Sequence, residues 1–129
     1  MDVTTLAALV FVVAACVVVA FQLALALGAP WGPFAMGGVF PGQFPAPMRI
    51  AAAIQGLLIA FLGLGVLSAA NLVLPDVTVT FPWLVWVAVA VSVVALVMNA
   101  MSRSAGERRI WVPVTLVLLF SSLIVALAR

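Results

Sequence analysis

The side chains most able to do chemistry in this chain are uncharged polar groups that stand inside long apolar stretches. They are Gln22, Gln55, Asn99 and Thr115. Amide and hydroxyl groups of this kind can bind a polar ligand, or they can hold helices together through hydrogen bonds. Because an unpaired amide in apolar surroundings is costly, we expect each group to meet another polar group or water.

Several other kinds of chemistry are excluded by the residues that the chain lacks. It contains no His, Lys or Tyr, which removes the commonest general base, the usual imidazole metal ligand and the P-loop lysine. Glu107 is surrounded in sequence by Arg103, Arg108 and Arg109, a pattern that favours a solvated ion-pair cluster over a lone general base. We therefore expect no enzyme activity, no cofactor and no metal site.

The composition places the chain in an apolar environment. Of its 129 residues, 68% are hydrophobic and 6% are charged, and the mean hydropathy is +1.46. A soluble domain carries about 45–50% apolar and about 25% charged residues, so this chain cannot cover a water-facing surface. Its arginines form no basic stripe, and we expect no nucleic-acid partner.

Four stretches are long enough to cross a bilayer, which requires about 20 mostly apolar residues. They cover residues 3–27, 50–74, 83–101 and 110–128, with a Gly- and Pro-rich loop at 28–48. Val-rich runs of this length exceed the roughly 9–11 residues of a membrane strand. The sequence therefore predicts an all-α, polytopic membrane protein with a single domain over 1–129, built as a bundle of four transmembrane helices.

The distribution of arginines predicts the orientation. Arg49 ends the first loop, and Arg103, Arg108 and Arg109 lie in the third, whereas the opposite side carries only Arg129. The positive-inside rule then places the first and third loops in the cytoplasm and both termini on the extracytoplasmic side. Tryptophans near the span ends match an aromatic belt, with Trp83 and Trp86 at the outer interface and Trp111 at the inner one.

In this orientation the polar residues gather near the cytoplasmic boundary. At about 1.5 Å per residue, all four lie roughly 5–9 Å inside it, each on a different span. One interpretation is structural, with interhelical hydrogen bonds fixing the packing of the helices. The other is a small polar cavity that opens to the cytoplasm. Its mouth would carry a ring of arginines able to bind an anionic headgroup or solute, namely Arg49, Arg103, Arg108 and Arg109.

Small residues recur along each span. Ala52, Gly56, Ala60 and Gly63 follow one face of the second span, and the third span has the same kind of spacing from Ala88 through Ser92 and Ala95 to Asn99. Close approach through small residues replaces the hydrophobic drive that lipid does not supply. These faces predict a compact left-handed bundle with one face left for a second copy.

The first loop combines Gly and Pro with large aromatic side chains. The aromatic residues are Trp31, Phe34, Phe40 and Phe44. A flexible linker would be polar, whereas aromatic side chains suit the level of the lipid headgroups. The loop is either an interfacial cap on the bundle or a lid over the polar cluster.

Two short strings carry a resemblance to known proteins. They are Gly-Ala-Pro-Trp-Gly at 28–32 and Glu-Arg-Arg-Ile-Trp at 107–111. With them, most of the chain resembles an uncharacterised group of small bacterial four-helix integral membrane proteins. The resemblance implies a multi-pass protein of the inner (cell) membrane. It implies no activity, ligand or catalytic residue.

Three classes of function remain. The first, and the one we favour, is a structural or accessory membrane protein that holds a partner through its small-residue faces. The second is a small oligomeric transporter or channel with a polar vestibule on the cytoplasmic side. The third is a protein that binds an anionic lipid or a small hydrophobic molecule. The expected partners are the lipid bilayer and either further copies of the chain or a larger membrane complex.

Overall fold

A computed structural model describes all residues from 1 to 129, and its regular secondary structure is entirely helical, with five α-helices and no strand. Three helices are long and apolar enough to cross a membrane, namely α1 (Val3–Ala26), α2 (Ala46–Ala69) and α5 (Ala105–Leu127). A fourth apolar helix, α4 (Leu84–Ala100), has 17 residues. The prediction of an all-α chain is confirmed.

Three short helical elements complete the chain. Two 3₁₀ turns, η1 (Gly32–Phe34) and η2 (Met36–Gly38), lie in the long first loop, and α3 (Pro75–Thr80) precedes α4. Helix α3 lies in the stretch between the predicted spans 50–74 and 83–101. The short helix forms there because Pro75 suits a first helical turn, after Leu74 reverses the chain with a left-handed φ of 42°.

The helix boundaries also differ from the predicted spans of residues 50–74 and 110–128. Helix α2 starts at Ala46, before the apolar stretch, because Pro47 is tolerated in its first turn, where no helical N–H partner is required. Helix α5 starts at Ala105, where the Ser104 side chain accepts the backbone N–H of Glu107 and caps the helix.

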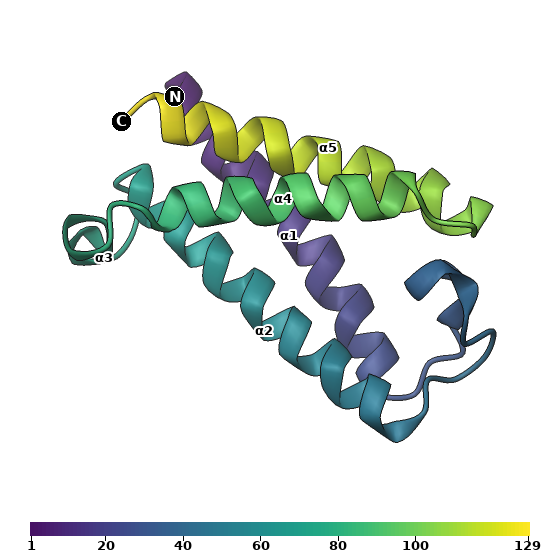
Figure 1. Ribbon diagram of the computed structural model, residues 1–129. Coiled ribbons are helices and arrows are strands. Elements are labelled where there is room, and N and C mark those ends of the chain that lie inside the picture. Colours follow the sequence, from purple (N-terminus) through teal and green to yellow (C-terminus); the bar gives the residue numbers. More distant parts are fainter.

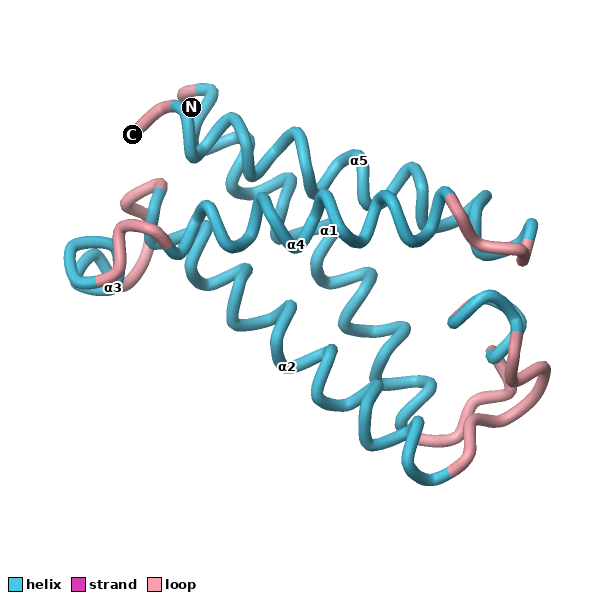
Figure 2. Tube along the Cα trace, viewed as in Figure 1, coloured by secondary structure: helices cyan, strands magenta, loops and turns pink.

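The long helices form two antiparallel pairs. Helices α1 and α2 lie side by side, α4 lies beside α5, and the pairs meet where α1 contacts α5 and α2 contacts α4 (Figure 1). Both chain termini and α3 lie at one end of the molecule, which we call the terminal end. The pairs diverge toward the opposite end, the loop end, where the connecting segments after α1 and after α4 lie (Figure 2).

The main core lies where the two pairs meet. Its largest fully buried side chains include Phe11, Leu62, Val66, Val85 and Val125, from all four long helices. Small residues surround them and let the backbones approach closely. Of the faces expected from the sequence, Ala52, Gly56, Gly63, Ala88 and Ser92 are buried. Ala60 is exposed instead, because it lies on the side of α2 that has no neighbour.

Candidate functional site

At the loop end, the first turns of α5 hold the long first loop through three hydrogen bonds. The Glu107 carboxylate Oε2 accepts the backbone N–H of Gly37 at 2.8 Å. The Ser104 hydroxyl donates to the Pro33 carbonyl at 2.6 Å. One turn further along, the Trp111 indole Nε1 donates to the carbonyl of the neighbouring Phe34 at 2.8 Å. We call this set the α5 latch, and it ties the 3₁₀ turns of the loop to a helix some 70 residues away.

The latch corrects the expectation of a solvated ion-pair cluster around Glu107. Its side chain is only 7% exposed, and its carboxylate oxygen is directed to a backbone N–H. Arg108 donates to the Ser102 carbonyl instead. A sequence signal for this role was present, because Ser104 and Glu107 have the Ser-x-x-Glu spacing of a capping box. Here the serine caps the helix, and the glutamate binds the loop.

Aromatic rings fill the space between α1 and α5 beside the latch. Phe21 of α1 stacks on Trp31 with 6.0 Å between ring centroids, and it meets Trp111 at 4.7 Å. On the other side of the loop, Phe40 and Phe44 pack edge to face at 5.5 Å. Ring contacts therefore connect Trp31 of the loop to Phe21 of α1, and Phe21 in turn to Trp111 of α5.

The loop fold depends on close backbone approaches. Gly32 donates its N–H to the Gly42 carbonyl at 3.0 Å, and a Cβ atom at Gly32 would lie 1.6 Å from the carbonyl oxygen of Phe40. Only glycine fits this position. The Phe34 ring packs onto Gly106 in the same way, since a Cβ there would lie 2.8 Å from the ring.

The structure does not join the four predicted polar side chains by hydrogen bonds. Asn99 Nδ2 donates to the Ala95 carbonyl at 2.7 Å, and the buried Thr115 hydroxyl donates to the Trp111 carbonyl at 2.6 Å. Gln22 is half-buried on α1 near Gly56, where an added Cβ would lie 3.4 Å from the Cβ of Gln22. Gln55 is exposed on the outer surface of α2.

The predicted ring of arginines divides into two kinds of residue. Arg49 is half-buried and donates from Nε to the Ala26 carbonyl at 2.9 Å, which satisfies the C-terminal end of α1. Arg108 donates a hydrogen bond to the Ser102 carbonyl in the turn before α5. Arg103 and Arg109 are exposed.

Polar contacts at the terminal end were not expected from the sequence. The buried Ser68 hydroxyl lies 2.7 Å from the hydroxyl of Thr78 and 2.7 Å from the Leu74 carbonyl, which fixes α3 against the end of α2. Arg129 donates to the Ala69 carbonyl at 2.9 Å and so closes the C-terminal end of α2. These contacts depend on where the chain turns after α2, and the hydropathy of the sequence does not predict the position of that turn.

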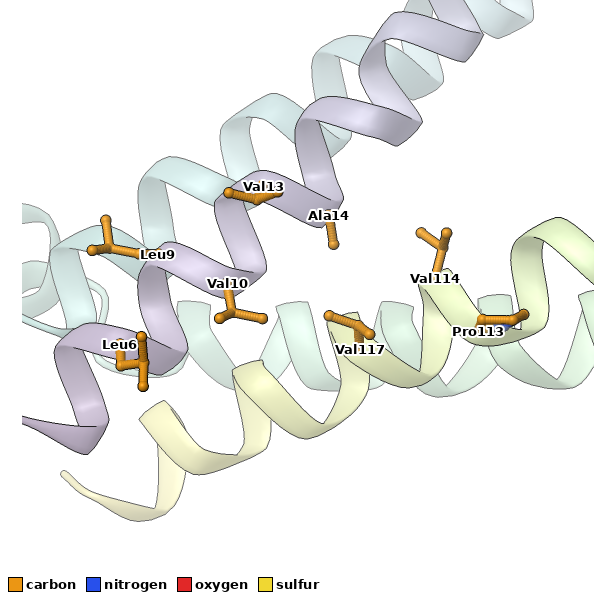
Figure 3. A pocket seen from close by; sticks show the side chains of 8 residues that line it. All are labelled: Leu6, Leu9, Val10, Val13, Ala14, Pro113, Val114 and Val117. Atoms are coloured by element: carbon orange, nitrogen blue, oxygen red, sulfur yellow. The ribbon is translucent and has the colours of Figure 1, made fainter.

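Two adjoining apolar hollows follow the outer seam between α1 and α5, which we call the α1–α5 groove. Their volumes are about 490 and about 370 Å³, and Leu6, Val10 and Val117 line both. In Figure 3, Ala14 and Val114 face each other across the seam. The groove contains almost no polar surface, so any occupant must be apolar.

Comparisons with protein-family models, with curated proteins and with solved structures find no match to this chain.

Proposed function

We propose that this chain is a multi-pass protein of the inner membrane, in the manner of the small bacterial four-helix proteins it resembles, and that its role is structural or accessory. In this proposal α1, α2, α4 and α5 each cross the bilayer, and both termini lie on the extracytoplasmic side. The protein holds a partner membrane helix against the outer face of α2. The partner is a second copy of the chain or a subunit of a larger membrane complex.

The membrane placement is supported by length, by surface and by the sidedness of the loops. Large apolar side chains such as Leu57, Phe61 and Met98 are 72%, 55% and 68% exposed, a surface unsuited to water. Helix α4 spans about 25 Å at 1.5 Å per residue, and a slightly short span is accommodated by local bilayer thinning. The first loop and the turn after α4 both lie at the loop end (Figure 1). Two proposed spans, α2 and α4, separate them, so they must lie on the same side of the bilayer.

The observation that carries the proposed role is the exposed amide of Gln55. It lies on α2 among the exposed side chains of Ile54, Leu57 and Leu58, about 9 Å along the helix from Arg49. Five other polar side chains of the long helices donate to a carbonyl of their own helix, namely Ser92, Asn99, Thr115, Ser121 and Ser122, whereas Gln55 makes no such bond. In lipid an amide has no water to bind, so Gln55 favours a neighbouring helix that offers a hydrogen bond.

The same hydrogen bonds favour an accessory role over a polar transport vestibule. Asn99 and Thr115 were candidates to line a vestibule, but each donates a hydrogen bond to a backbone carbonyl of its own helix. Gln55 faces outward rather than toward them. A transporter would need these groups to face a common space, and a packing role needs only the local bonds that they make.

Single-cysteine crosslinking in native membranes tests the proposed role. In a Cys16→Ala background, Leu58→Cys beside Gln55 is expected to form crosslinked adducts, whereas Val97→Cys on the outer face of α4 is not. Adding Gln55→Leu is expected to lower the yield severalfold, because each interhelical hydrogen bond of this kind contributes about 0.6 kcal/mol, and an amide can make more than one. Gln43→Leu, which changes an exposed amide in the loop, is the matched control. Adducts that do not depend on Gln55, or no adducts from α2, would contradict the proposal.

A further inference from the structure

The α1–α5 groove is distinct from the α2 face described above, and it is an open apolar hollow along the seam between two helices. Leu6, Val10 and Ala14 form one wall on α1, and Pro113, Val114 and Val117 form the other on α5. Figure 3 shows the two helices diverging toward Pro113, so that the small Ala14 side chain leaves the groove unfilled. Only one hydroxyl reaches the adjoining hollow, that of Ser121, and it donates to carbonyls of its own helix. The occupant therefore needs no hydrogen bond from the groove.

The length of the groove matches the thickness of one bilayer leaflet. From Pro113 to Ile124 the α5 wall runs for about 16 Å, roughly half of the ~30 Å hydrocarbon core. One acyl chain of a phospholipid has this reach, and it can follow a curved groove between crossing helices.

A single unpaired cation stands above the groove. Arg109 lies one helical turn before Pro113, so it continues the α5 face that carries Pro113, Val117 and Ile124. Its guanidinium is exposed, whereas Arg49, Arg108 and Arg129 each donate to a backbone carbonyl. At about 6 Å above the end of the groove, a phosphate bound to Arg109 would sit at headgroup level while its chain entered the groove.

We propose that the α1–α5 groove binds one anionic phospholipid from the cytoplasmic leaflet, with an acyl chain between α1 and α5 and the phosphate on Arg109. Charge complementarity selects the headgroup, and the apolar groove takes the chain. The proposal rests on the membrane placement proposed above but not on association through Gln55, because the two sites lie on different helix faces.

Native mass spectrometry of the purified, delipidated protein tests this site. The probes are phosphatidylglycerol and phosphatidylcholine with the same two oleoyl chains. We expect one phosphatidylglycerol to bind more tightly than phosphatidylcholine. Arg109→Gln is expected to weaken its binding about fivefold, as the loss of one basic side chain near a membrane surface predicts. Arg103→Gln removes another exposed arginine, which lies in the turn before α5 rather than on the helix, and it is expected to leave binding unchanged.

A variant that fills the groove separates the contribution of the acyl chain to lipid binding from that of the headgroup. Val117 lines both hollows and is 40% exposed, so Val117→Trp is expected to block the groove and abolish binding of both lipids. Val97→Trp on α4, 49% exposed, is the matched control and is expected to bind normally. The Leu58→Cys crosslink on α2 is expected to persist in Val117→Trp. Binding unaffected by Val117→Trp would overturn the proposal, as would equal losses from the two arginine variants. A dimer lost only in Val117→Trp would instead assign the groove to a second copy.

A measurement on the unaltered chain covers the case in which Val117→Trp does not fold. Phosphatidylglycerol carrying a diazirine near the end of one acyl chain is expected, on illumination, to label peptides of α1 and α5 that contain groove residues. Labelling spread evenly over α2 and α4 as well would overturn the proposal.

Discussion

The carboxylate of Glu107 and the backbone N–H of Gly37 lie 2.8 Å apart across 70 residues of sequence. This one contact joins the first turn of α5 to the second 3₁₀ turn of the loop. The glutamate is 7% exposed, so its acceptor oxygens have little access to water. The carboxylate therefore positions the loop, and its removal should lower the free energy of unfolding.

Removing the acceptor should loosen the loop. Glu107→Ala leaves the Gly37 N–H without its partner and is expected to cost about 1–3 kcal/mol of unfolding free energy. Glu107→Gln retains a carbonyl acceptor of the same length and should cost clearly less. Thermal unfolding in detergent, with amide hydrogen exchange at Gly37, measures both effects. Equal losses in the two variants would mean that the negative charge matters more than the acceptor.

Two loop glycines make a matched pair for testing the close backbone approach. Gly32→Ala would place a Cβ 1.6 Å from the Phe40 carbonyl oxygen, whereas Gly42→Ala meets nothing within 4 Å. We expect Gly32→Ala to disrupt the loop and lower stability by about 1–3 kcal/mol or more, as overpacking does, and Gly42→Ala to be tolerated. Limited proteolysis of the loop and tryptophan fluorescence report the difference. A loop equally protected in both variants would argue against this conformation.

A second pair of glycines tests the packing of α2 against α4. An added Cβ at Gly65 would lie 2.8 Å from the Leu84 side chain, and one at Gly63 would meet nothing within 4 Å. Gly65→Ala is expected to destabilise the protein by about 1 kcal/mol, near the lower limit for overpacking, because the end of Leu84 can shift. Gly63→Ala should be neutral or stabilising by up to about 1 kcal/mol, since alanine favours a helix interior. Thermal unfolding of the two variants in the same detergent gives the comparison, and the reverse order would contradict this packing.

The sidedness predicted from the arginines can be read by cysteine labelling. In a Cys16→Ala background, a membrane-impermeant maleimide added outside is expected to label Asp76→Cys and to miss Ala105→Cys. Both positions are exposed, so accessibility within the protein does not decide the result. Permeabilised cells, in which both sites should react, provide the control. Labelling of Ala105→Cys alone would invert the orientation and move Arg109 to the outer leaflet.

The sequence predicted the long helices well because hydropathy and length determine them. It misplaced their ends where short-range capping decides the boundary, as at Ser104 before α5 and at the prolines before and inside the first turn of α2. It identified the small faces, but it did not show that Ala60 would be exposed. A face becomes buried only when another helix covers it, and the divergence of the helix pairs determines that coverage.

For the polar side chains, the sequence predicted the position along each helix but not the direction in which the side chain points. The predicted depth in a membrane follows from position along a helix, so the sequence predicts similar depths for Gln55 and Thr115. Direction depends on how each helix is rotated, and these two side chains point to different surroundings, one exposed and one buried. Glu107 was expected in water with its neighbouring arginines because its partner, Gly37, belongs to a distant segment.

The two arginines that close helix ends differ in how much of the chain must be present before their bonds can form. Arg49 reaches the end of α1 across 23 residues, so the α1–α2 hairpin can lock while the rest of the chain is still being synthesised. Arg129 reaches the end of α2 across 60 residues and follows the whole of α5. Contacts close in sequence form early and distant ones late. The helices of the first hairpin can thus pair before α5 exists, whereas the loop between them reaches its final arrangement only when Ser104, Glu107 and Trp111 at the start of α5 hold it.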